Sequence, residues 1–330
     1  MTARLLSAAF RWGPRLPELL VRALAALAAH VAWLAHGKGV RRLEANLARV
    51  RPGLTRWGLR RLSHAGMRSY LRYYAEMLTQ PGLSEAQVDA RVRLVNDAWA
   101  RERFAAGQSV VAALGHLGNW DLAGVWACRN LAPTTTVAER LEPERVFQDF
   151  LALREGAGMR IVPLGRGEGG QAFRELTREV RAGGRFVPLL ADRDLSHSGV
   201  QVDLFGHPAR VAPGPAALTS NGQATLCAVS ITYERLHGDR RRRAGSRWGI
   251  RVEFSDPIVV DDALAGRERV QAATQAWVDV LAQTVAAAPQ DWHMLQRVFV
   301  ADLDPDRDAQ VTGARAADDQ TADDQTAGGA

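Results

Sequence analysis

Residues 109–130 read SVVAALGHLGNWDLAGVWACRN, a short apolar run followed by a histidine between glycines and then a helical stretch. The run at 109–114 is typical of a buried strand, and the segment near 119–130 is typical of a helix. The same alternation continues along the chain, with strands expected at 134–138, 159–164 and 185–191 and helices near 143–156 and 170–182. Strand–helix alternation of this length favours right-handed crossovers and a mostly parallel sheet.

Two later segments predict strands of a different kind. Residues 226–235 (LCAVSITYER) and 248–260 (WGIRVEFSDPIVV) alternate apolar and polar side chains, which is typical of an antiparallel pair. We expect the basic stretch between them, GDRRRRAGSR, to be a solvated loop, and a last helix near 268–286. The sequence therefore predicts an α/β fold: a mostly parallel central sheet with an antiparallel addition, flanked by helices.

The N-terminal region has a helical apolar pattern of its own. Residues 17–36 read LPELLVRALAALAAHVAWLA, and Glu18, Arg22 and His30 interrupt a stretch otherwise long enough to span a membrane. We interpret this segment as a helix that lies in the membrane interface, flanked by arginines. The alternative is a buried core helix of a helical subdomain.

Positive charge is concentrated in the same region. Residues 1–73 hold thirteen arginines and Lys38 against Glu18 and Glu44, a net of +12, whereas the whole chain carries only +6. A basic block of this kind predicts a polyanionic partner. The adjoining apolar helix favours an anionic membrane surface over nucleic acid, because no recognised nucleic-acid-binding module accompanies the arginines.

Length and composition set the domain organisation. The 330 residues are 47% hydrophobic and 24% charged, which is ordinary for globular proteins and excludes a wholly disordered chain. Cys128 and Cys227 lie in no C-x-x-C motif, so a zinc ribbon or thioredoxin-type site is excluded. We predict a helical, membrane-associating region at 1–80, an α/β domain at 81–302 and an acidic, disordered tail at 303–330.

His116 is the first candidate for catalysis, because ligands bind at the carboxyl ends of strands in α/β sheets. A histidine can act as a general base near neutral pH, and a carboxylate can hold its tautomer. Gly115 and Gly118 flank it, and we expect them to let a substrate approach closely. Asp121 lies five residues further on, as a partner of His116 or as a helix cap.

Two more strand ends deliver charged side chains to the same edge of the predicted sheet. Asp192 follows the strand at 185–191, with Arg193 beside it, and Glu139 follows the strand at 134–138. No P-loop, nucleophile elbow or cluster with metal-ligand spacing competes with these residues. The charged residues at these strand ends therefore predict an acid–base site that requires no metal.

Four segments resemble the lysophospholipid/lipid A biosynthesis acyltransferase family. They are GHLGNWD, VAERLEPERVFQDFLALREGAGMRIVPL, LLADRDLSHSGVQVDLFGHPARVAPGPAAL and PQDWHMLQRVF, and the resemblance covers roughly residues 15–300. Within the family the chain is most similar to the phosphatidylinositol mannoside acyltransferases. The resemblance implies an enzyme peripheral on the cytoplasmic face of the cell inner membrane. It implies palmitoyl transfer from acyl-CoA to a mannose 6-hydroxyl of the glycolipid, with no cofactor beyond the acyl-CoA co-substrate.

The resemblance also assigns roles to individual residues. His116 matches the catalytic histidine, Asp121 completes its H-x4-D motif, and Asp192 falls at the acidic position that pairs with the histidine. Glu139 and Arg154 match charged positions that line the active-site groove and contact substrate. Some members are expected to carry glutamate at position 192, and aspartate is one methylene shorter. The contact of Asp192 with His116 could therefore be indirect, and either Asp121 or Asp192 remains open as the residue that orients the imidazole.

Two alternatives to this function stay open at the level of sequence. One is a lipid A late acyltransferase that uses acyl carrier protein as its donor. The other is a non-catalytic peripheral protein that binds anionic lipid through residues 1–73.

Overall fold

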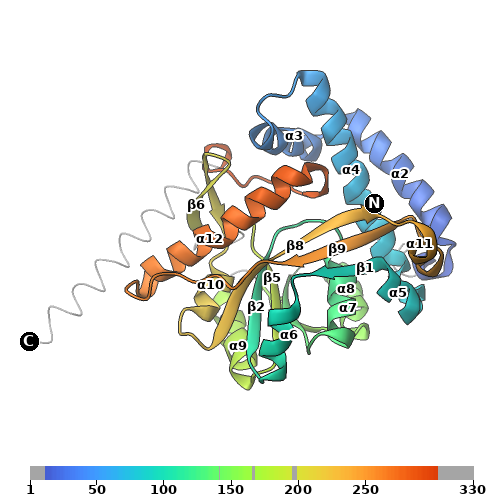
Figure 1. The fold of residues 1–330 in the computed structure, drawn as a ribbon. Coiled ribbons are helices and arrows are strands. Elements are labelled where there is room, and N and C mark those ends of the chain that lie inside the picture. Colours follow the sequence, from blue (N-terminus) through green and yellow to red (C-terminus); the bar gives the residue numbers. More distant parts are fainter. Residues whose placement is uncertain (1–11, 141, 166–167, 195–198, 304–330) are drawn as a thin grey trace, which may run out of the picture.

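A computed structural model of the chain describes residues 12–140, 142–165, 168–194 and 199–303. Its centre is a five-stranded sheet in the order β1-β9-β8-β2-β5 (Figure 1). The strands are β1 (Val92–Val95), β9 (Trp248–Phe254), β8 (Ala224–Arg235), β2 (Ser109–Leu114) and β5 (Phe186–Leu190). The pairs β1–β9, β2–β5 and β2–β8 are parallel, and β8–β9 is antiparallel. The predicted α/β fold with an antiparallel addition is therefore confirmed.

Two further strands continue the sheet beyond β5. β3 (Thr135–Glu139) pairs in parallel with β4 (Arg160–Leu164). A single bridge joins Thr134 to Phe186 of β5, and the Thr136 hydroxyl donates to the Pro188 carbonyl at 2.6 Å. The carboxyl ends of β2, β3 and β5 therefore lie along one edge, as their spacing in the sequence predicts.

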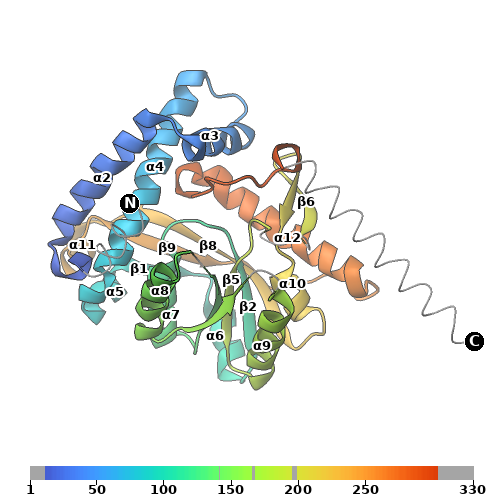
Figure 2. The same ribbon diagram turned by 180° about the vertical axis from the view of Figure 1, so that it is seen from behind.

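Helices cover both faces of the sheet, as the two opposite views show (Figures 1 and 2). The helices are α5 (Glu85–Arg91), α6 (Ala98–Ala105), α7 (Trp120–Asn130), α8 (Glu144–Gly156), α9 (Gly169–Ala182), α10 (Gly214–Thr219) and α12 (Gly266–Ala287). Val110, Ala112 and Leu114 of β2 join the cluster that contains residues of α7 and α8. Val111 and Ala113 join the clusters of α9, α10 and α12. Burial on both faces explains why all six residues of β2 are apolar or small.

Three local features differ from the expectations. The basic stretch after β8 forms a short helix, α11 (Gly238–Ala244), which Gly245 ends at a φ of 60°. Four of its seven residues are arginines, so the stretch has no periodic apolar positions that would predict a helix. The last predicted strand ends at Phe254 instead of residue 260. A hairpin of β6 (Val200–Leu204) and β7 (His207–Val211) was not expected and is missing from our prediction.

The described part of the N-terminal region, from residue 12 on, contains three consecutive helices, α2 (Glu18–Ala35), α3 (Lys38–Val50) and α4 (Arg56–Thr79). Ala29, Val40, Leu43, Leu47 and Met67 form a small core between them. Short 3-10 turns complete the described elements: η1 (Gly13–Arg15), η2 (Gln80–Gly82), η3 (Pro289–Asp291) and η4 (Val300–Asp302). The predicted acidic tail lies outside the described residues from 304 onward, and the proposed domain boundaries stay predictions.

Helix α2 exposes most of its apolar surface. Leu19 is 80% exposed and Leu27 is 61% exposed, and only Val21 and Ala29 of this helix are buried. The alternative of a buried core helix is therefore wrong. Among the described residues, α2 is the one helix that is long and apolar enough to cross a membrane by length and composition.

Candidate active site

The loop between β2 and α7 carries His116 and is fixed at its end. Asn119 caps α7, and its side-chain oxygen accepts a hydrogen bond from the Leu122 N–H at 3.0 Å. The amide nitrogen of Asn119 donates to Glu76 of α4 at 3.0 Å, and both side chains are buried. Helix α4 therefore holds the end of the loop that starts α7.

Gly115 and Gly118 do not make room for a substrate, contrary to our expectation. A Cβ atom at Gly115 would lie 2.6 Å from Leu281 Cδ1 of α12. Gly118 has a φ of +58°, and a Cβ there would lie 2.5 Å from the carbonyl oxygen of Ile231 in β8. Both glycines instead let the loop pack closely against the protein itself.

His116 and Asp192 form a close pair at the ends of β2 and β5. The Nδ1 atom of His116 lies 2.5 Å from Asp192 Oδ1, and the His116 backbone N–H donates to Asp192 Oδ2 at 2.9 Å. Asp192 is fully buried, whereas 18% of the His116 side chain is exposed. The structure therefore places Asp192, of the two candidate carboxylates, against the imidazole.

The surroundings of Asp192 favour its ionised form. Burial alone would raise the pKa of this carboxyl, but the charge and hydrogen bonds of His116 and the hydrogen bond from Trp292 outweigh burial and lower the pKa. An ionised Asp192 that accepts from Nδ1 leaves Nε2 of His116 as the ring atom that can take up a proton.

A segment near the end of the described chain completes the loop, and our sequence reasoning assigned it no role. The indole N–H of Trp292 donates to Asp192 Oδ2 at 2.9 Å. The His293 N–H donates to the His116 carbonyl at 2.8 Å, and the Gly118 N–H donates to the Asp291 carbonyl at 3.1 Å. We call residues 291–293 the strap, because they run antiparallel to the His116 loop and bridge it at Leu117. No local pattern could have revealed these long-range contacts.

Asp121 belongs to a different cluster. Arg154 Nε of α8 donates to Asp121 Oδ1 at 2.7 Å, and the Tyr73 hydroxyl of α4 donates to Oδ2 at 2.6 Å. Burial would lower the pKa of Arg154, but the charge of Asp121 outweighs it and raises the pKa. The cluster thus ties α4, α7 and α8 together behind Trp120, whose ring lies edge-on to that of His116 at 5.5 Å.

Glu139 and Arg193 meet at the open edge of the site. Glu139 ends β3, is 45% exposed at its side chain and lies 3.4 Å from Arg193 Nη2. Arg193 directly follows Asp192, and its other terminal nitrogen contacts Gln296. Of the two predicted substrate contacts, Glu139 is therefore accessible, whereas Arg154 is largely buried against Asp121.

An apolar cavity lies beside the loop. Its volume is about 40 Å³, and its lining includes Leu114 of β2 with Trp120, Ala123, Gly124 and Ala127 of α7. One water molecule needs ~10–15 Å³ of such space, so the cavity has room for only a few water molecules. A long apolar ligand would enter only if lining side chains move.

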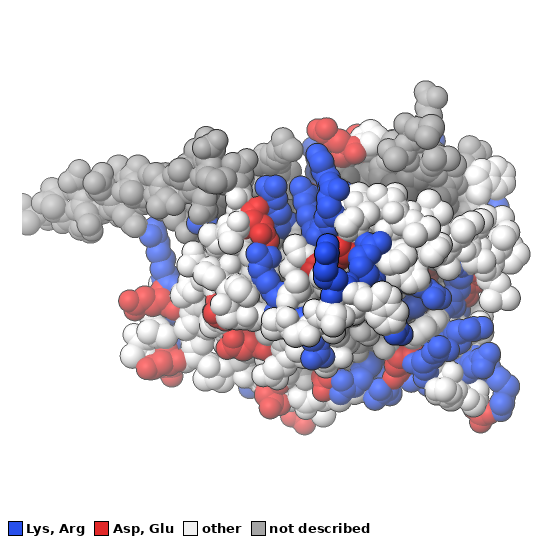
Figure 3. All heavy atoms as spheres, turned by 90° about the horizontal axis from the view of Figure 1, so that it is seen from above, with Lys and Arg blue, Asp and Glu red and all other residues white. Residues whose placement is uncertain are grey.

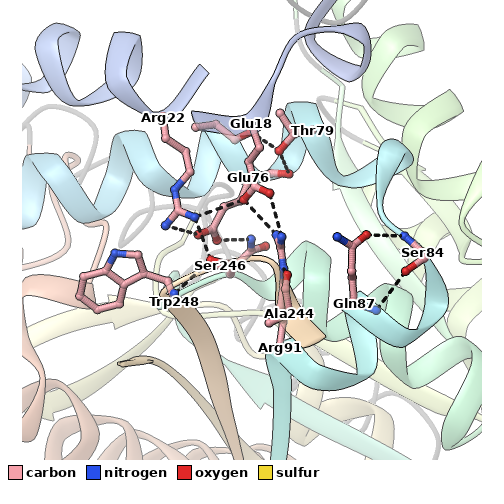
Figure 4. Close-up of polar contacts among 12 residues, drawn as sticks. Glu18, Arg22, Glu76, Thr79, Ser84, Gln87, Arg91, Ala244, Ser246 and Trp248 are labelled. Carbon is pink, nitrogen blue, oxygen red and sulfur yellow. Dashed lines mark hydrogen bonds and ion pairs between the residues drawn. The ribbon is translucent and has the colours of Figure 1, made fainter. Parts of the chain in front are cut away.

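Partly buried ion pairs attach α2 to the body of the protein (Figure 4). Arg91 of α5 donates to both carboxylate oxygens of Glu18, at 3.1 and 2.8 Å. Arg22 donates to the Ser246 hydroxyl at 2.8 Å and lies 3.8 Å from Glu76. Burial raises the pKa of Glu76, although Arg22 acts to lower it. Glu18 and Arg22 of α2 therefore face the protein.

The described residues contain no group of three or more His, Cys, Asp and Glu side chains placed to hold a metal ion.

Comparison with known proteins gives consistent matches along the chain. The family model described as bacterial lipid A biosynthesis acyltransferase matches residues 6–300. The chain is 35% identical over 305 residues to a phosphatidylinositol mannoside acyltransferase of Mycolicibacterium smegmatis, covering 92% of this chain and 93% of the relative. It is 37% identical over 298 residues to the protein of the same name from Mycobacterium tuberculosis, covering 90% and 88%. The 1-acyl-sn-glycerophosphate acyltransferase PlsC of Thermotoga maritima is 14% identical with a TM-score of 0.32, covering 82% of this chain and 96% of that one, and this likeness carries no inference.

Proposed function

The chain belongs to the bacterial lipid A biosynthesis acyltransferase family, and we propose that it moves a palmitoyl group from acyl-CoA to the 6-hydroxyl of a mannose of a phosphatidylinositol mannoside. The chain is thus an acyltransferase, as the resemblance of its motifs predicted. The names of its relatives support the acceptor, and the observation that carries the chemistry is the contact between His116 and Asp192.

The geometry of this pair supports a general-base mechanism. Asp192 accepts a hydrogen bond from Nδ1, so Nε2 is free to take the proton from the mannose hydroxyl. As the proton leaves, the hydroxyl oxygen forms a bond to the thioester carbonyl carbon. The tetrahedral oxyanion then collapses, the C–S bond breaks, and the proton passes from the imidazolium to the departing CoA thiolate. Asp192 stabilises the imidazolium between these two transfers.

The cavity beside the loop supports a place for the acyl chain. Its walls are apolar, and it adjoins Trp120, whose ring contacts the ring of His116. A thioester held at Nε2 would direct its chain toward this cavity, between β2 and α7. Because the volume is only about 40 Å³, binding of a long chain requires displacement of lining side chains.

The exposed face of α2 supports peripheral attachment to a membrane, and the resemblance to the family implies the cytoplasmic face. A spanning α2 would separate Glu18 from Arg91 and Arg22 from Glu76, leaving buried charges without partners at several kcal/mol each (Figure 4). A helix that lies in the interface keeps these ion pairs and buries its leucines in the lipid.

Release of CoA from palmitoyl-CoA tests the proposal. We expect thiol release that depends on mannosylated phosphatidylinositol, with the palmitoylated glycolipid identified by mass spectrometry. Transfer from acyl carrier protein to a lipid A precursor, with none to the mannoside, would identify a lipid A enzyme instead. A protein that binds anionic vesicles and transfers no acyl group from either donor would show a lipid-binding role only.

A further inference from the structure

A basic groove runs along one side of α3. It has a volume of about 450 Å³ and lies between α3 and the segment that follows the strap. Its walls are Lys38, Arg41, Arg42, Ala45 and Asn46 on one side and Gln296, Arg297 and Asp302 on the other. We call it the α3 groove. Figure 3 looks down on this end of the molecule and shows Lys and Arg side chains gathered there.

The cations of the α3 groove have no anionic partner among the described residues. Arg41 contacts only the carbonyl oxygen of His36, at 3.4 Å, and no described carboxylate pairs with Lys38, Arg42 or Arg297. The groove's acid, Asp302, is held by Arg49 through two hydrogen bonds of 2.6 and 2.9 Å. Four like charges around one hollow repel one another, and a bound anion would relieve that repulsion.

The walls of the groove are held at a fixed spacing. Asn46 is buried, and its amide nitrogen donates to the carbonyl oxygens of both Met294 and Gln296 at 2.9 Å. Helix α3 is thereby fixed to the segment that leads out of the strap. The arginines therefore present their guanidinium groups from a rigid frame, and guanidinium groups bind phosphate oxygens in a bidentate way.

The position of the groove indicates where the phosphate comes from. Helix α2 ends at Ala35, immediately before α3, and its last turns expose Val31 and Leu34. A phosphate in the groove would therefore lie beside an apolar face that suits the lipid surface. On the other side, Gln296 contacts Arg193, the neighbour of Asp192. The groove thus adjoins both the apolar helix and the catalytic edge.

We propose that the α3 groove binds the phosphodiester of the lipid acceptor, so that its headgroup sugars extend toward His116. This inference rests on the proposed acyl transfer for the identity of the lipid. The phosphate itself would be recognised whether or not the protein transfers an acyl group.

Residue-resolved protection of arginines from phenylglyoxal tests the binding with the full-length protein. We expect vesicles of phosphatidylcholine and phosphatidylinositol to slow modification of Arg41, Arg42 and Arg297 at least tenfold relative to phosphatidylcholine alone. Arg241 and Arg243 of α11, which are exposed and have no described ion pair, should show no such difference. Equal protection by both kinds of vesicle, protection by CoA without vesicles, or no protection would each overturn the proposal.

Substitutions then test the link to the acceptor. In Arg41→Gln/Arg42→Gln we expect the KM for the mannosylated lipid to rise at least tenfold, with the KM for palmitoyl-CoA unchanged. The control Arg241→Gln/Arg243→Gln removes the same charge outside the groove and should change neither value. A rise in the KM for palmitoyl-CoA instead would overturn the assignment to the acceptor. Arginine protection without any acyl transfer in the unmodified protein would count against the proposed function and not against the phosphate site.

Discussion

In the proposed mechanism, the chemistry of the site depends on one hydrogen-bonded carboxylate. Asp192 accepts from His116 Nδ1, from the His116 backbone and from the Trp292 indole, which accounts for the orientation of both side chains. Asp121 has equally short contacts, but they go to Arg154 and Tyr73. The two aspartates therefore have separable consequences when they are substituted.

A double-mutant cycle separates them. His116→Ala should lower acyl transfer by ~10²–10⁴ through loss of the general base. Asp192→Ala should lower it too, and the double variant should be little worse than His116→Ala alone, because residues that act as a unit are not additive. The measurement is the kcat of CoA release.

Asp121→Ala is the comparison in this cycle. It leaves Arg154 buried without its partner, so the free energy of unfolding should fall by about 3–5 kcal/mol. Its effect on kcat should add to that of His116→Ala. Epistasis at Asp121 and none at Asp192 would contradict the assigned pair, and full activity in His116→Ala would refute the enzymatic mechanism.

Trp292 is predicted to position Asp192. In Trp292→Phe the carboxylate loses one donor and becomes more basic, which strengthens its hold on the imidazolium. We nevertheless expect kcat to fall about tenfold, because Asp192 is oriented less firmly toward Nδ1 without the indole donor, and a hydrogen bond to a charged group contributes ~1.5–3 kcal/mol. The acid limb of the pH–rate profile should also move to higher pH.

Trp277→Phe is the matched control for this substitution. Trp277 is fully buried in the same hydrophobic cluster as Trp292, and its indole nitrogen has no hydrogen-bond partner among the described residues. The control removes the same volume without removing a hydrogen bond. An unchanged acid limb in Trp292→Phe, or an equal shift in Trp277→Phe, would reduce Trp292 to a packing role.

At the scale of elements, α2 is an apolar helix held on its polar side. Its outward face should enter the lipid surface, and burial of one leucine contributes ~1.5–3 kcal/mol. Leu27→Glu should therefore weaken binding to anionic vesicles by ten- to a hundredfold, measured by co-sedimentation. Binding of the unmodified protein should weaken with salt, because the Debye length falls from ~10 Å at 0.1 M to ~3 Å at 1 M.

Val259→Glu provides the control for α2. Val259 is 84% exposed and lies far along the chain, after β9. This variant should bind vesicles as the unmodified protein does. Attachment that resists salt and needs detergent for release would indicate a membrane-spanning helix and contradict the interfacial placement.

The elements differ in how far the sequence could predict them. β2 is buried on both faces, so its apolar run has sharp ends and the predicted bounds agree with the structure. Helix α11 is short and lacks an apolar period, so local pattern could not identify it. Strand β6 does alternate apolar and polar residues over Val200–Leu204, so the β6–β7 hairpin was within reach of the sequence and our prediction missed it. His116 and Asp192 could be found because each ends a strand. The choice between Asp121 and Asp192 needed the tertiary structure.

At the scale of the whole molecule, the buried strap links stability to pH. Burial, reinforced by the neighbouring His116, lowers the pKa of His293 to about 3 from 6.5. Between these values the unfolded chain binds a proton that the folded protein does not, so stability falls as pH falls. The loss is ~1.4 kcal/mol per pH unit, or about 2 kcal/mol between pH 6.5 and 5.

His293→Gln removes this titration and should flatten the dependence of unfolding free energy on pH over that range, measured by chemical denaturation. Asp192 has a lowered pKa, so its contribution to folding stability is lost only below its ordinary pKa of 3.8. That range lies outside the window of pH 5 to 6.5. Burial raises the pKa values of Glu76 and Asp291, so these two groups make stability rise as pH falls. Both are present in the unmodified protein and in His293→Gln, so they do not affect the comparison. Equal slopes in the two proteins would show that His293 is accessible to protons in the folded state.

The strap also has a consequence for biosynthesis. Its contacts join residues far apart in the sequence, such as Ser69 and Asp291, which are separated by 222 positions. Contacts of this range form late in folding, because a long loop must close first. During synthesis on the ribosome, the carboxylate that holds His116 lacks its indole donor until Trp292 has emerged. Under the proposed function, a nascent chain therefore exposes its apolar N-terminal helix well before the catalytic pair is fully held, and acyl transfer begins only after residue 292 has been synthesised.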